Sequence, residues 1–290
     1  MDELKELMEQ IEQKRIQEKN DLMKAITQAG STESFLQTKM MTRLAKLNTT
    51  PEMIAETGLN LLGFYEQRLE DCERCGESIL CFGIDRGKYP AVEDNQLYMK
   101  RCAKYEQAMF RSRLEQAGVQ KRFLDATFDS YVATTIVQKK AIKKILSYTK
   151  TFENGLLITG PVGTGKTHLA IAVLREALKR DMKCSFVEVP ALLSAIRDSY
   201  RTGKAPRGLD ATFLVLDDLG AEKVTDWVKE QLYLIVNERY LSMQPTVITT
   251  NCSLEELEAN VSQRIVSRIL AMTDGVLLAG EDYRKKRLKE

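Results

Sequence analysis

The eight residues Gly160–Thr167, GPVGTGKT, combine the residue types that bind a phosphate chain. Glycines let backbone N–H groups close around phosphate oxygens, and the helix that should follow adds a favourable dipole. We expect Lys166 to reach the β- and γ-phosphates of ATP, and the Thr167 hydroxyl to ligate Mg²⁺. The residues predicted to line the nucleotide are Gly160, Pro161, Val162, Gly163, Thr164, Gly165, Lys166, Thr167 and His168.

The segments on either side of this P-loop have the character that the motif requires. Residues 155–159 are apolar and are predicted to form a strand, and residues 168–178 have the pattern of a helix. The alternative, a chance glycine-rich turn, is disfavoured because both flanking elements are present. His168 is the only histidine of the chain. We interpret it as a local structural residue rather than a catalyst.

A second apolar segment, Phe213–Leu216, is followed by two carboxylates, Asp217 and Asp218. Two acids at a strand end are commonplace by themselves, but here they follow a P-loop by about 50 residues. We expect Asp217 to position Mg²⁺, and Asp218 to orient or deprotonate the attacking water. The sequence therefore predicts hydrolysis of ATP.

A polar side chain and two cations complete the candidate site. Asn251 follows the apolar segment 245–250 and is placed to hydrogen-bond the attacking water or the γ-phosphate, although asparagine at a strand end is often a turn residue. Arg264 and Arg268 are four residues apart and share a helical face. An arginine supplied by a neighbouring subunit can stabilise charge in the transition state. For a random pair, the alternative is a solvated helix face.

The elements expected to position these residues alternate between strands and helices after about residue 121. This order predicts an α/β fold with a five-stranded, largely parallel sheet flanked by helices. We place a domain boundary near residues 110–120, with an N-terminal domain over 1–115 and an ATPase domain over 121–290. The predicted strands are Leu156–Thr159, Ser185–Val189, Phe213–Leu216, Thr246–Thr249 and Val276–Leu278.

Composition limits the class of protein. The chain of 290 residues is 43% hydrophobic and 29% charged, with a formal net charge of +2, which argues against a general polyanion binder. No apolar run is long enough for a bilayer and no signal core precedes the first helix, so we expect a cytoplasmic protein without membrane contact. Residues 1–70 are predicted to be charged and mainly helical, either an ordinary helical domain or a partner-binding arm.

Four of the six cysteines lie between residues 72 and 102. Cys72 and Cys75 form a C-x-x-C pair, and Cys81 and Cys102 can complete a tetrahedral Cys₄ zinc site. Free thiols are the alternative. Cys184 and Cys252 are interpreted as structural.

The stretch from about 121 to 290 resembles the AAA+ ATPase domain of the DnaC/DnaI helicase loaders and their relative IstB. The motifs that carry the resemblance are GPVGTGKTH, FLVLDDLGAE, PTVITTN, the Ser-Arg pair of VSRI and the terminal Asp282-Tyr-Arg. The resemblance implies an AAA+ P-loop fold, Arg268 as the arginine finger with Arg264 as its rival, and self-association through the finger. It also implies that Arg284 contacts the nucleotide as sensor 2. Asp218 departs from the usual glutamate, which implies slow or assembly-dependent hydrolysis.

The resemblance also implies partners. Loaders of this group contact single-stranded DNA, and the corresponding positions here are Tyr200, Arg201, Thr225 and Trp227. Packing on or beneath a helix is the alternative for both aromatic residues. DnaI-type loaders carry an N-terminal zinc module that engages the replicative helicase. Some members use a histidine ligand between the first cysteine pair and the last cysteine. This chain has no histidine there, so we assign Cys81 as the third ligand.

The hypothesis that joins these features is an ATP-dependent helicase loader. It would bind a hexameric replicative helicase and deliver it onto single-stranded DNA, with the ATP state controlling release. One alternative is an IstB-like transposase helper ATPase, which is not expected to carry the cysteine module. The other is a nucleotide-gated adaptor with little turnover.

Overall fold

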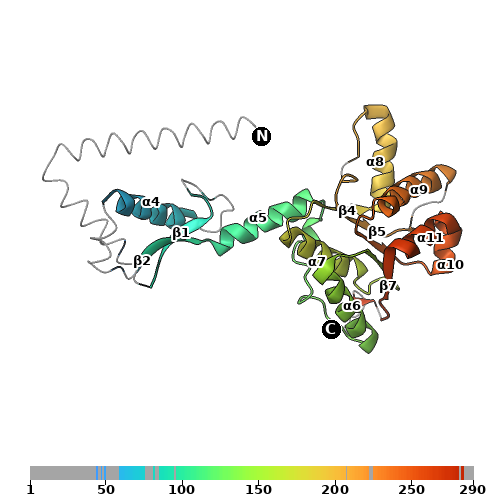
Figure 1. The fold of residues 1–290 in the computed structure, drawn as a ribbon, viewed down its shortest axis with the longest axis horizontal. Coiled ribbons are helices and arrows are strands. Elements are labelled where there is room, and N and C mark those ends of the chain that lie inside the picture. The colour runs from blue at the N-terminus through green and yellow to red at the C-terminus, as the bar shows by residue number, and fades with distance from the viewer. Residues whose placement is uncertain are drawn as a thin grey trace. The chain divides into compact units, whose positions relative to one another are not determined.

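The computed structural model describes residues 44, 47, 49, 59–75, 81, 85–94, 96–206, 208–221, 225–280 and 282–283 (Figure 1). The chain divides into two compact units, Met1–Phe110 and Arg111–Glu290. The division falls inside helix α5, Ala103–Gln116. No helix within the described ranges is both long and apolar enough to cross a membrane. Most of the helical stretch expected over residues 1–70 lies outside these ranges.

The described part of the first unit contains a helix and a β-hairpin. Helix α4, Leu59–Cys75, runs through Gly63 without interruption. Strands β1, Lys88–Glu93, and β2, Gln96–Arg101, pair antiparallel. The Tyr65 hydroxyl of α4 donates to the carbonyl oxygen of Leu97 at 3.1 Å, which ties the helix to the hairpin. The sequence analysis predicted no strand in this region.

The second unit is built on a five-stranded parallel sheet, as predicted. Its order is β4-β5-β6-β3-β7, so the P-loop strand β3 lies between β6 and β7, and the strand of the two acids, β5, lies next to β6. Because all neighbours are parallel, the carboxyl ends of β3, β5 and β6 meet at one edge of the sheet. The strands are β3 Gly155–Thr159, β4 Cys184–Glu188, β5 Phe213–Asp217, β6 Thr246–Thr250 and β7 Thr273–Leu277.

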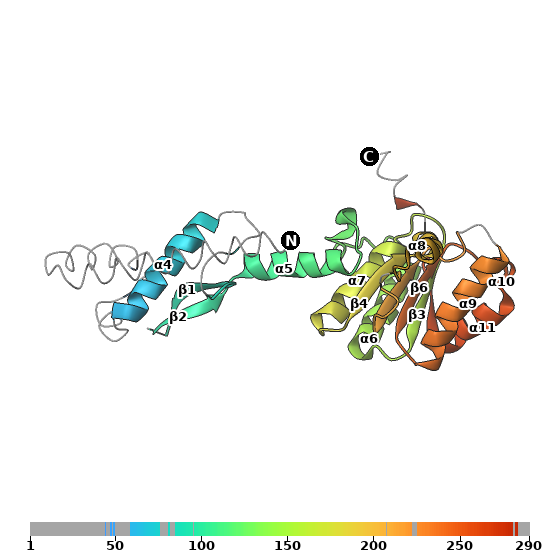
Figure 2. The ribbon, with the colours of Figure 1, turned by 90° about the horizontal axis from the view of Figure 1, so that it is seen from above.

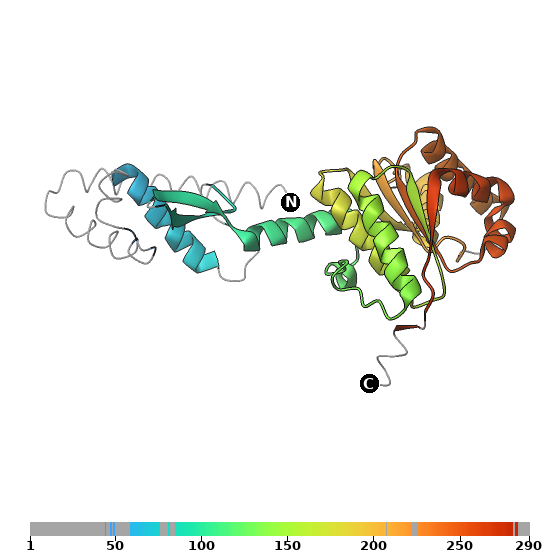
Figure 3. The ribbon, with the colours of Figure 1, turned by 60° about the horizontal axis from the view of Figure 1, so that its bottom comes forward.

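Helices cover both faces of this sheet (Figures 2 and 3). Helices α6 and α7 lie on one face, and α8 to α11 share the other, where they form one core with β3, β5 and β6. This three-layer arrangement confirms the predicted α/β class. The helices are α6 Ile136–Thr151, α7 Lys166–Lys179, α8 Val189–Thr202, α9 Asp226–Leu241, α10 Leu254–Val261 and α11 Gln263–Met272, and Lys121–Phe123 form a 3₁₀ turn, η2.

One buried arginine fastens α9 to the amino ends of β5 and β6. Arg239 is only 3% exposed. Its planar fork donates five hydrogen bonds, a number that uses every N–H of a guanidinium. The acceptors are the carbonyl oxygens of Ala211, Thr212 and Pro245, the side-chain oxygen of Gln244 and the hydroxyl of Thr246.

The segment between α5 and α6 packs against the sheet unit rather than standing apart from it. The carbonyl oxygen of Ala117 accepts from the amide of Phe186 on β4 at 2.7 Å. The Arg175 guanidinium of α7 donates to the carbonyl oxygen of Leu124 at 2.6 Å. Through these two contacts the segment after α5 packs first against the edge strand β4 and then against the P-loop helix α7. They also position the residues that follow Leu124.

Candidate functional site

The P-loop connects β3 to α7, which begins at Lys166. Nζ of Lys166 donates to the carbonyl oxygens of Gly160 at 2.8 Å and Pro161 at 2.9 Å. The residue is 7% exposed, so its charge is held inside the loop by the backbone of the loop. An ammonium group in this position can exchange carbonyl oxygens for phosphate oxygens, which bind it more strongly because they are charged.

Asp217, the first of the two acids, lies directly beside Thr167 of the P-loop. Oδ2 of Asp217 accepts from the Thr167 hydroxyl at 3.0 Å, and Oδ1 accepts from the Thr249 hydroxyl at 2.7 Å. Asp217 is 5% exposed. Burial raises the pKa of its carboxyl group, and the two hydroxyl donors oppose that rise. Two hard oxygen ligands on adjacent elements, one of them a buried anion, suit a small divalent cation.

The second acid, Asp218, is hydrogen-bonded to Asn251, the polar residue expected to bind the attacking water or the γ-phosphate. Nδ2 of Asn251, just after β6, donates to Oδ1 of Asp218 at 2.7 Å. Asp218 has a φ of +63°, a conformation uncommon for residues other than glycine. The structure therefore brings Asp217, Asp218, Asn251 and Thr167 together at the carboxyl edge of the sheet.

A tyrosine that the sequence analysis did not single out supports the P-loop from behind. The Tyr131 hydroxyl donates to the carbonyl oxygen of Thr164 at 2.7 Å. Its ring lies against Gly165, where φ is +90° and an added Cβ would approach a ring carbon to 2.5 Å. Burial raises the pKa of the Tyr131 hydroxyl, which keeps it a donor. A lone aromatic residue in a non-periodic segment gives no signal that identifies such a contact.

His168 joins the P-loop helix to the same segment. Its Nε2 lies 2.8 Å from the carbonyl oxygen of Thr127 and 3.2 Å from the Ser130 hydroxyl. A carbonyl oxygen only accepts, so Nε2 carries the proton. The ring packs edge-on against Tyr131, with centroids 5.7 Å apart. The imidazole is therefore engaged with the segment that precedes α6.

The chain after β7 returns across the P-loop. The Tyr283 amide donates to the carbonyl oxygen of Gly163 at 3.1 Å. Gly163 has no room for a side chain, because a Cβ there would overlap the Asp282 carboxylate. The terminal Asp-Tyr-Arg motif is thus near the phosphate-binding loop, although Arg284 itself lies outside the described residues.

Comparison with known proteins places this site in a family. A model of the family described as IstB-like ATP-binding proteins matches residues 95–290, more than half of the chain. The chain belongs to the IstB-like ATP-binding family. The match includes the P-loop, both acids, Asn251 and both candidate finger arginines, and it begins inside the β1–β2 hairpin.

Individual relatives of this IstB-like protein include replicative helicase loaders. It is 26% identical over 223 residues to the loader DnaC of Escherichia coli (strain K12), covering 73% of this chain and 88% of that protein. It is 24% identical over 264 residues to the loader DnaI of Bacillus subtilis (strain 168), covering 80% and 85%. An ATP-binding protein of insertion sequence IS5376 from Geobacillus stearothermophilus is 32% identical over 179 residues, covering 57% and 69%.

A solved structure agrees with the family assignment. A crystal structure of the DnaC helicase loader superposes with a TM-score of 0.51 at 30% identity, covering 55% of this chain and 99% of that one. A primosome component from Streptococcus pyogenes gives a TM-score of 0.52 at 22% identity, which supports the fold alone. The IstB-like protein is therefore an ATP-binding protein with a P-loop fold of the AAA+ type.

Arg268 of this IstB-like protein is anchored to its own subunit. Nε donates to Oδ1 of Asn237 at 2.8 Å, and a terminal nitrogen donates to the Tyr233 hydroxyl at 3.1 Å. The guanidinium carbon lies 4.8 Å from the centroid of the Tyr233 ring. Both partners belong to α9. Arg264, one turn earlier on α11, is exposed.

The four predicted DNA contacts lie on α8 and at the start of α9. Tyr200 is 70% exposed. Arg201 pairs with Asp198 at 2.6 Å, and the Thr225 hydroxyl caps α9 by accepting from the amide of Val228 at 3.3 Å. Trp227 packs partly against the core.

Trp227 also links the two helices that carry these residues. The guanidinium carbon of Arg197 on α8 lies 4.9 Å from the centroid of the Trp227 ring. Of the two aromatic residues predicted to face DNA, Tyr200 is therefore exposed to solvent, whereas Trp227 makes structural contacts with the core and with Arg197.

The predicted zinc ligands Cys72, Cys75, Cys81 and Cys102 do not form a metal site in the structure. Among the residues that the structure describes, no three histidine, cysteine or acidic side chains are grouped so as to hold a metal ion. Instead, the buried Arg68 guanidinium lies 3.8 Å from Sγ of Cys72 and 3.6 Å from Sγ of Cys81. The cation that the structure places beside these two sulfur atoms is therefore Arg68.

Cys81, Cys102 and Cys75 nevertheless lie near enough to the Cys72 thiol to influence its pKa. Burial raises the pKa of the Cys72 thiol, Arg68 lowers it, and the proximity of Cys81, Cys102 and Cys75 raises it further. The amide of Gly87 also donates to Sγ of Cys81 at 3.3 Å.

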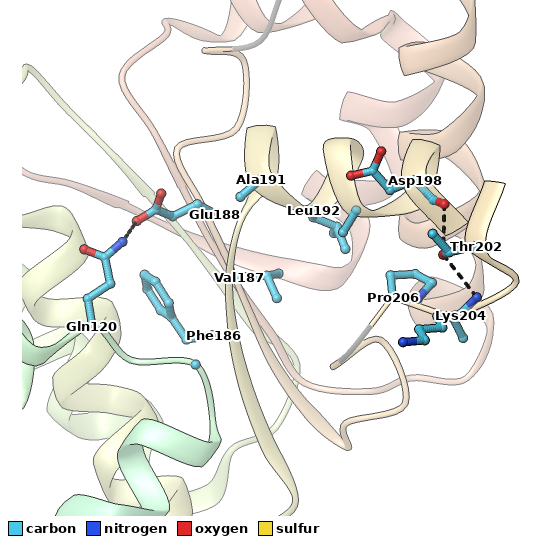
Figure 4. A pocket seen from close by; sticks show the side chains of 13 residues that line it. Gln120, Phe186, Val187, Glu188, Ala191, Leu192, Asp198, Thr202, Lys204 and Pro206 are labelled. Atoms are coloured by element: carbon cyan, nitrogen blue, oxygen red, sulfur yellow. Dashed lines mark hydrogen bonds between the residues drawn. The ribbon is translucent and has the colours of Figure 1, made fainter. Parts of the chain in front are cut away.

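A cavity of about 510 Å³ lies beside the edge strand β4 (Figure 4). Phe186 and Leu192 contribute apolar surface, and a hydrogen bond of 2.5 Å joins Gln120 to Glu188 at one side. No P-loop residue lines this cavity. It is separate from the nucleotide site. Its lining residues are Gly118, Gln120, Phe186, Val187, Glu188, Ala191, Leu192, Ala195, Asp198, Thr202, Lys204, Ala205 and Pro206.

Proposed function

We propose that this chain is an ATP-dependent loader of a hexameric replicative DNA helicase. The observation that carries the proposal is the extent of the similarity to loaders. The unit Arg111–Glu290 makes up 180 of the 290 residues. The match to the Bacillus subtilis loader covers 80% of the chain, so it extends into the first unit, whereas the match to the IS5376 protein covers 57%.

The nucleotide site supports ATP hydrolysis as the timing step. Lys166 exchanges its two carbonyl partners for phosphate oxygens, and the loop amides surround the same group. Asp218 orients a water molecule and accepts its proton as the water oxygen bonds to the γ-phosphorus and the bond to ADP breaks. Asn251, within hydrogen-bonding distance of Asp218, holds the same water or a γ-oxygen.

Magnesium fits the pair of oxygen ligands offered by Thr167 and Asp217. When bound, Mg²⁺ neutralises charge that develops on the transferred phosphoryl group. Asp217 would position the ion through its water shell, and Thr167 would ligate it through its hydroxyl. Asp218 is one methylene shorter than glutamate, so we propose slow turnover that rises when the chain assembles.

A neighbouring subunit in an assembly supplies a further cation to the nucleotide site. Arg268, or its rival Arg264, reaches the γ-phosphate of a neighbouring subunit as an arginine finger. In the single chain the Arg268 guanidinium is bonded to Asn237 and Tyr233, so it has to exchange these partners for phosphate oxygens to act as the finger. The finger proposal comes from the family resemblance, as does the role of Arg284 as sensor 2.

Single-stranded DNA is the second proposed partner. The exposed ring of Tyr200 offers a stacking surface, and Arg201, Thr225 and Trp227 supply flanking contacts. Trp227 is the only tryptophan, so its fluorescence reports directly on strand binding. Replacing Tyr200 with Ala should weaken oligonucleotide binding by about 1–3 kcal/mol, the value of one base stack.

The control for that replacement is Tyr240→Ala on α9, which removes an exposed tyrosine that the proposal does not use. If both variants bind an oligonucleotide as tightly as the wild type, Tyr200 is not a DNA contact. The measurement is a titration followed by Trp227 fluorescence at fixed salt, because phosphate contacts are salt-dependent.

The first unit is proposed to grip the helicase, with zinc held by Cys72, Cys75, Cys81 and Cys102. The support is the proximity of the four thiols and the Gly87 amide that donates to Cys81. Binding of zinc would require Arg68 to leave the two sulfur atoms. Metal analysis of protein purified without chelator tests this: about one zinc per chain is expected, and metal-free protein with intact thiols would contradict it.

The central test is a binding assay with the hexameric replicative helicase of the same cell. We expect a complex with ATP that dissociates after hydrolysis, and an Asp218→Asn chain, expected to bind ATP without hydrolysing it, that stays bound. Failure to bind that helicase, with ATP or with ADP, would remove the loader proposal. The similarity to the IS5376 protein favours a transposase helper as the second candidate, and binding to a transposase instead of a helicase would establish it.

A further inference from the structure

Thr249 is a buried polar residue at the centre of the candidate site that the preceding assignments leave without a role. It lies near the carboxyl end of β6 and pairs with Ile158 of the P-loop strand. On the other side, the β5–β6 register ends at the pair Leu216 and Ile248, immediately before Asp217 and Thr249. Thr249 is therefore flanked by both strands of the site, and it is 1% exposed.

The hydroxyl and the carbonyl oxygen of Thr249 are both hydrogen-bonded to residues at or just after the end of β5. Its hydroxyl donates to Oδ1 of Asp217 at 2.7 Å and accepts from the amide of Asp218 at 2.9 Å. Its carbonyl oxygen accepts from the amide of Leu219 at 2.9 Å. One side chain thus controls the orientation of the first acid and the backbone that presents the second.

The direction of these hydrogen bonds is determined. The Asp218 amide can only donate, so the Thr249 oxygen accepts there and its single proton points at Asp217. The carboxylate of Asp217 then receives one donor on each oxygen, Thr249 on Oδ1 and Thr167 on Oδ2. Its plane is held in one orientation, with the oxygen nearest the P-loop directed at Thr167.

The same bonds support an unfavourable backbone. Asp218 adopts φ of +63°, which costs roughly 1–3 kcal/mol for a residue that is not glycine unless its surroundings hold it there. The amides of Asp218 and Leu219, on either side of the Asp218 carbonyl carbon, both donate to Thr249. The turn that aims the Asp218 side chain at Asn251 is therefore fastened to Thr249.

We infer that Thr249 is a positioning residue for the metal-binding carboxylate Asp217 and for Asp218, acting without contact to the nucleotide. The inference rests on the proposed ATPase function. A purely structural role would not require a hydroxyl, because valine has the same shape and suits a buried strand at least as well. Residues that orient metal ligands typically change metal affinity or activity by about 10–100-fold when they are replaced.

The test compares Thr249→Val, which removes only the hydroxyl, with Thr249→Ser, which keeps it. The matched control is Thr246→Val, at the opposite end of the same strand. Thr246 is equally buried, and its hydroxyl also makes two hydrogen bonds, to Arg239 and Gln244. Three measurements are made: ATP binding in EDTA, the Mg²⁺ concentration for half-maximal turnover, and the rise in Tm that Mg²⁺ produces with a non-hydrolysable ATP analogue.

For Thr249→Val we expect unchanged ATP binding in EDTA, about 10–100-fold more Mg²⁺ for half-maximal turnover, and a smaller Mg²⁺-dependent rise in Tm. Thr249→Ser should restore most of the wild-type response. Thr246→Val should lower Tm without altering the Mg²⁺ requirement. The inference is overturned if Thr249→Val responds to Mg²⁺ as Thr246→Val does, or if serine fails as completely as valine.

A failure of the Thr249 inference can be distinguished from a failure of the proposed ATPase function. A wild-type protein that binds Mg²⁺ and the analogue but never turns over contradicts the ATPase proposal, while the Tm measurement still decides the role of Thr249. A wild-type protein that binds neither contradicts both.

Discussion

The side-chain amide of Asn251 donates to the carboxylate of Asp218 at 2.7 Å, across the ends of two adjacent parallel strands. Asp218 is therefore oriented by a neutral donor rather than by a cation. A neutral donor fixes the direction of the carboxylate without placing a formal positive charge beside it. This arrangement suits the proposed role of Asp218 in accepting a proton from water.

Replacing Asp218 with Asn should stop turnover while ATP binding persists. The substitution keeps the shape of the side chain and removes the proton acceptor, and loss of a general base typically costs about 10²–10⁴-fold in kcat. Steady-state phosphate release and equilibrium ATP binding are the two measurements. Turnover that survives in Asp218→Asn would show that another group accepts the proton.

Replacing Lys166 with Ala should abolish ATP binding at concentrations that saturate the wild type. The buried ammonium group is the positive charge that the P-loop directs at the phosphates, and we expect a fall in affinity of at least about 100-fold, or roughly 2.7 kcal/mol. Lys179→Ala, at the exposed end of the same helix, is the control and should bind normally. Equal affinities for the two variants would contradict the assignment.

Gly165→Ala should weaken ATP binding because of two separate costs. A Cβ at Gly165 meets the Tyr131 ring, and φ of +90° is strained for alanine by about 1–3 kcal/mol. In a Tyr131→Ala background the first cost is absent, so Gly165→Ala should weaken ATP binding less there than in the wild type. Gly203→Ala, also at positive φ but with no atom within 4 Å of the added Cβ, should lower Tm slightly and leave ATP binding unchanged.

Mixing two inactive variants should identify the arginine finger. Lys166→Ala lacks a working nucleotide site but retains the finger, and Arg268→Ala has the reverse defect. If the finger acts between subunits, the mixture hydrolyses ATP faster than either variant alone, because a finger is worth about 10³–10⁵-fold in kcat. The parallel mixture with Arg264→Ala is the comparison, and activity of Arg264→Ala by itself would exclude that rival.

Arg239→Ala should destabilise the sheet unit without any direct effect on catalysis. Five acceptors lose their donor, two of them on the buried residues Ala211 and Thr246, and we expect a loss of about 3 kcal/mol or more in the free energy of unfolding. For a unit of this size, that corresponds to a fall of roughly 6–12 °C in Tm. Lys183→Ala, which breaks the exposed pair with Asp210, should change stability by less than about 1 kcal/mol.

Local sequence patterns were sufficient for the sheet but not for the hairpin. Strands β3, β5 and β6 are buried on both faces and consist of apolar residues and threonine, apart from the terminal Asp217 of β5, and such runs are recognisable without structural information. Strands β1 and β2 are mostly half-buried, and charged residues such as Lys88 and Glu93 interrupt them. Their pairing depends on contact with α4, through bonds such as that of Tyr65, which no local pattern encodes.

The sequence by itself identified the residues proposed to carry the chemistry, because the P-loop, Asp217, Asp218 and Asn251 each lie at or just after the end of a recognisable strand. Only the tertiary structure decided which residues position them. Thr249 and Tyr131 act through hydrogen bonds to partners 32 and 33 residues away, and such contacts exist only after the parallel strands have aligned their ends. It also placed the Arg68 guanidinium against Cys72 and Cys81, because a buried cation is held by the neighbours that the fold provides and not by the spacing of the cysteines.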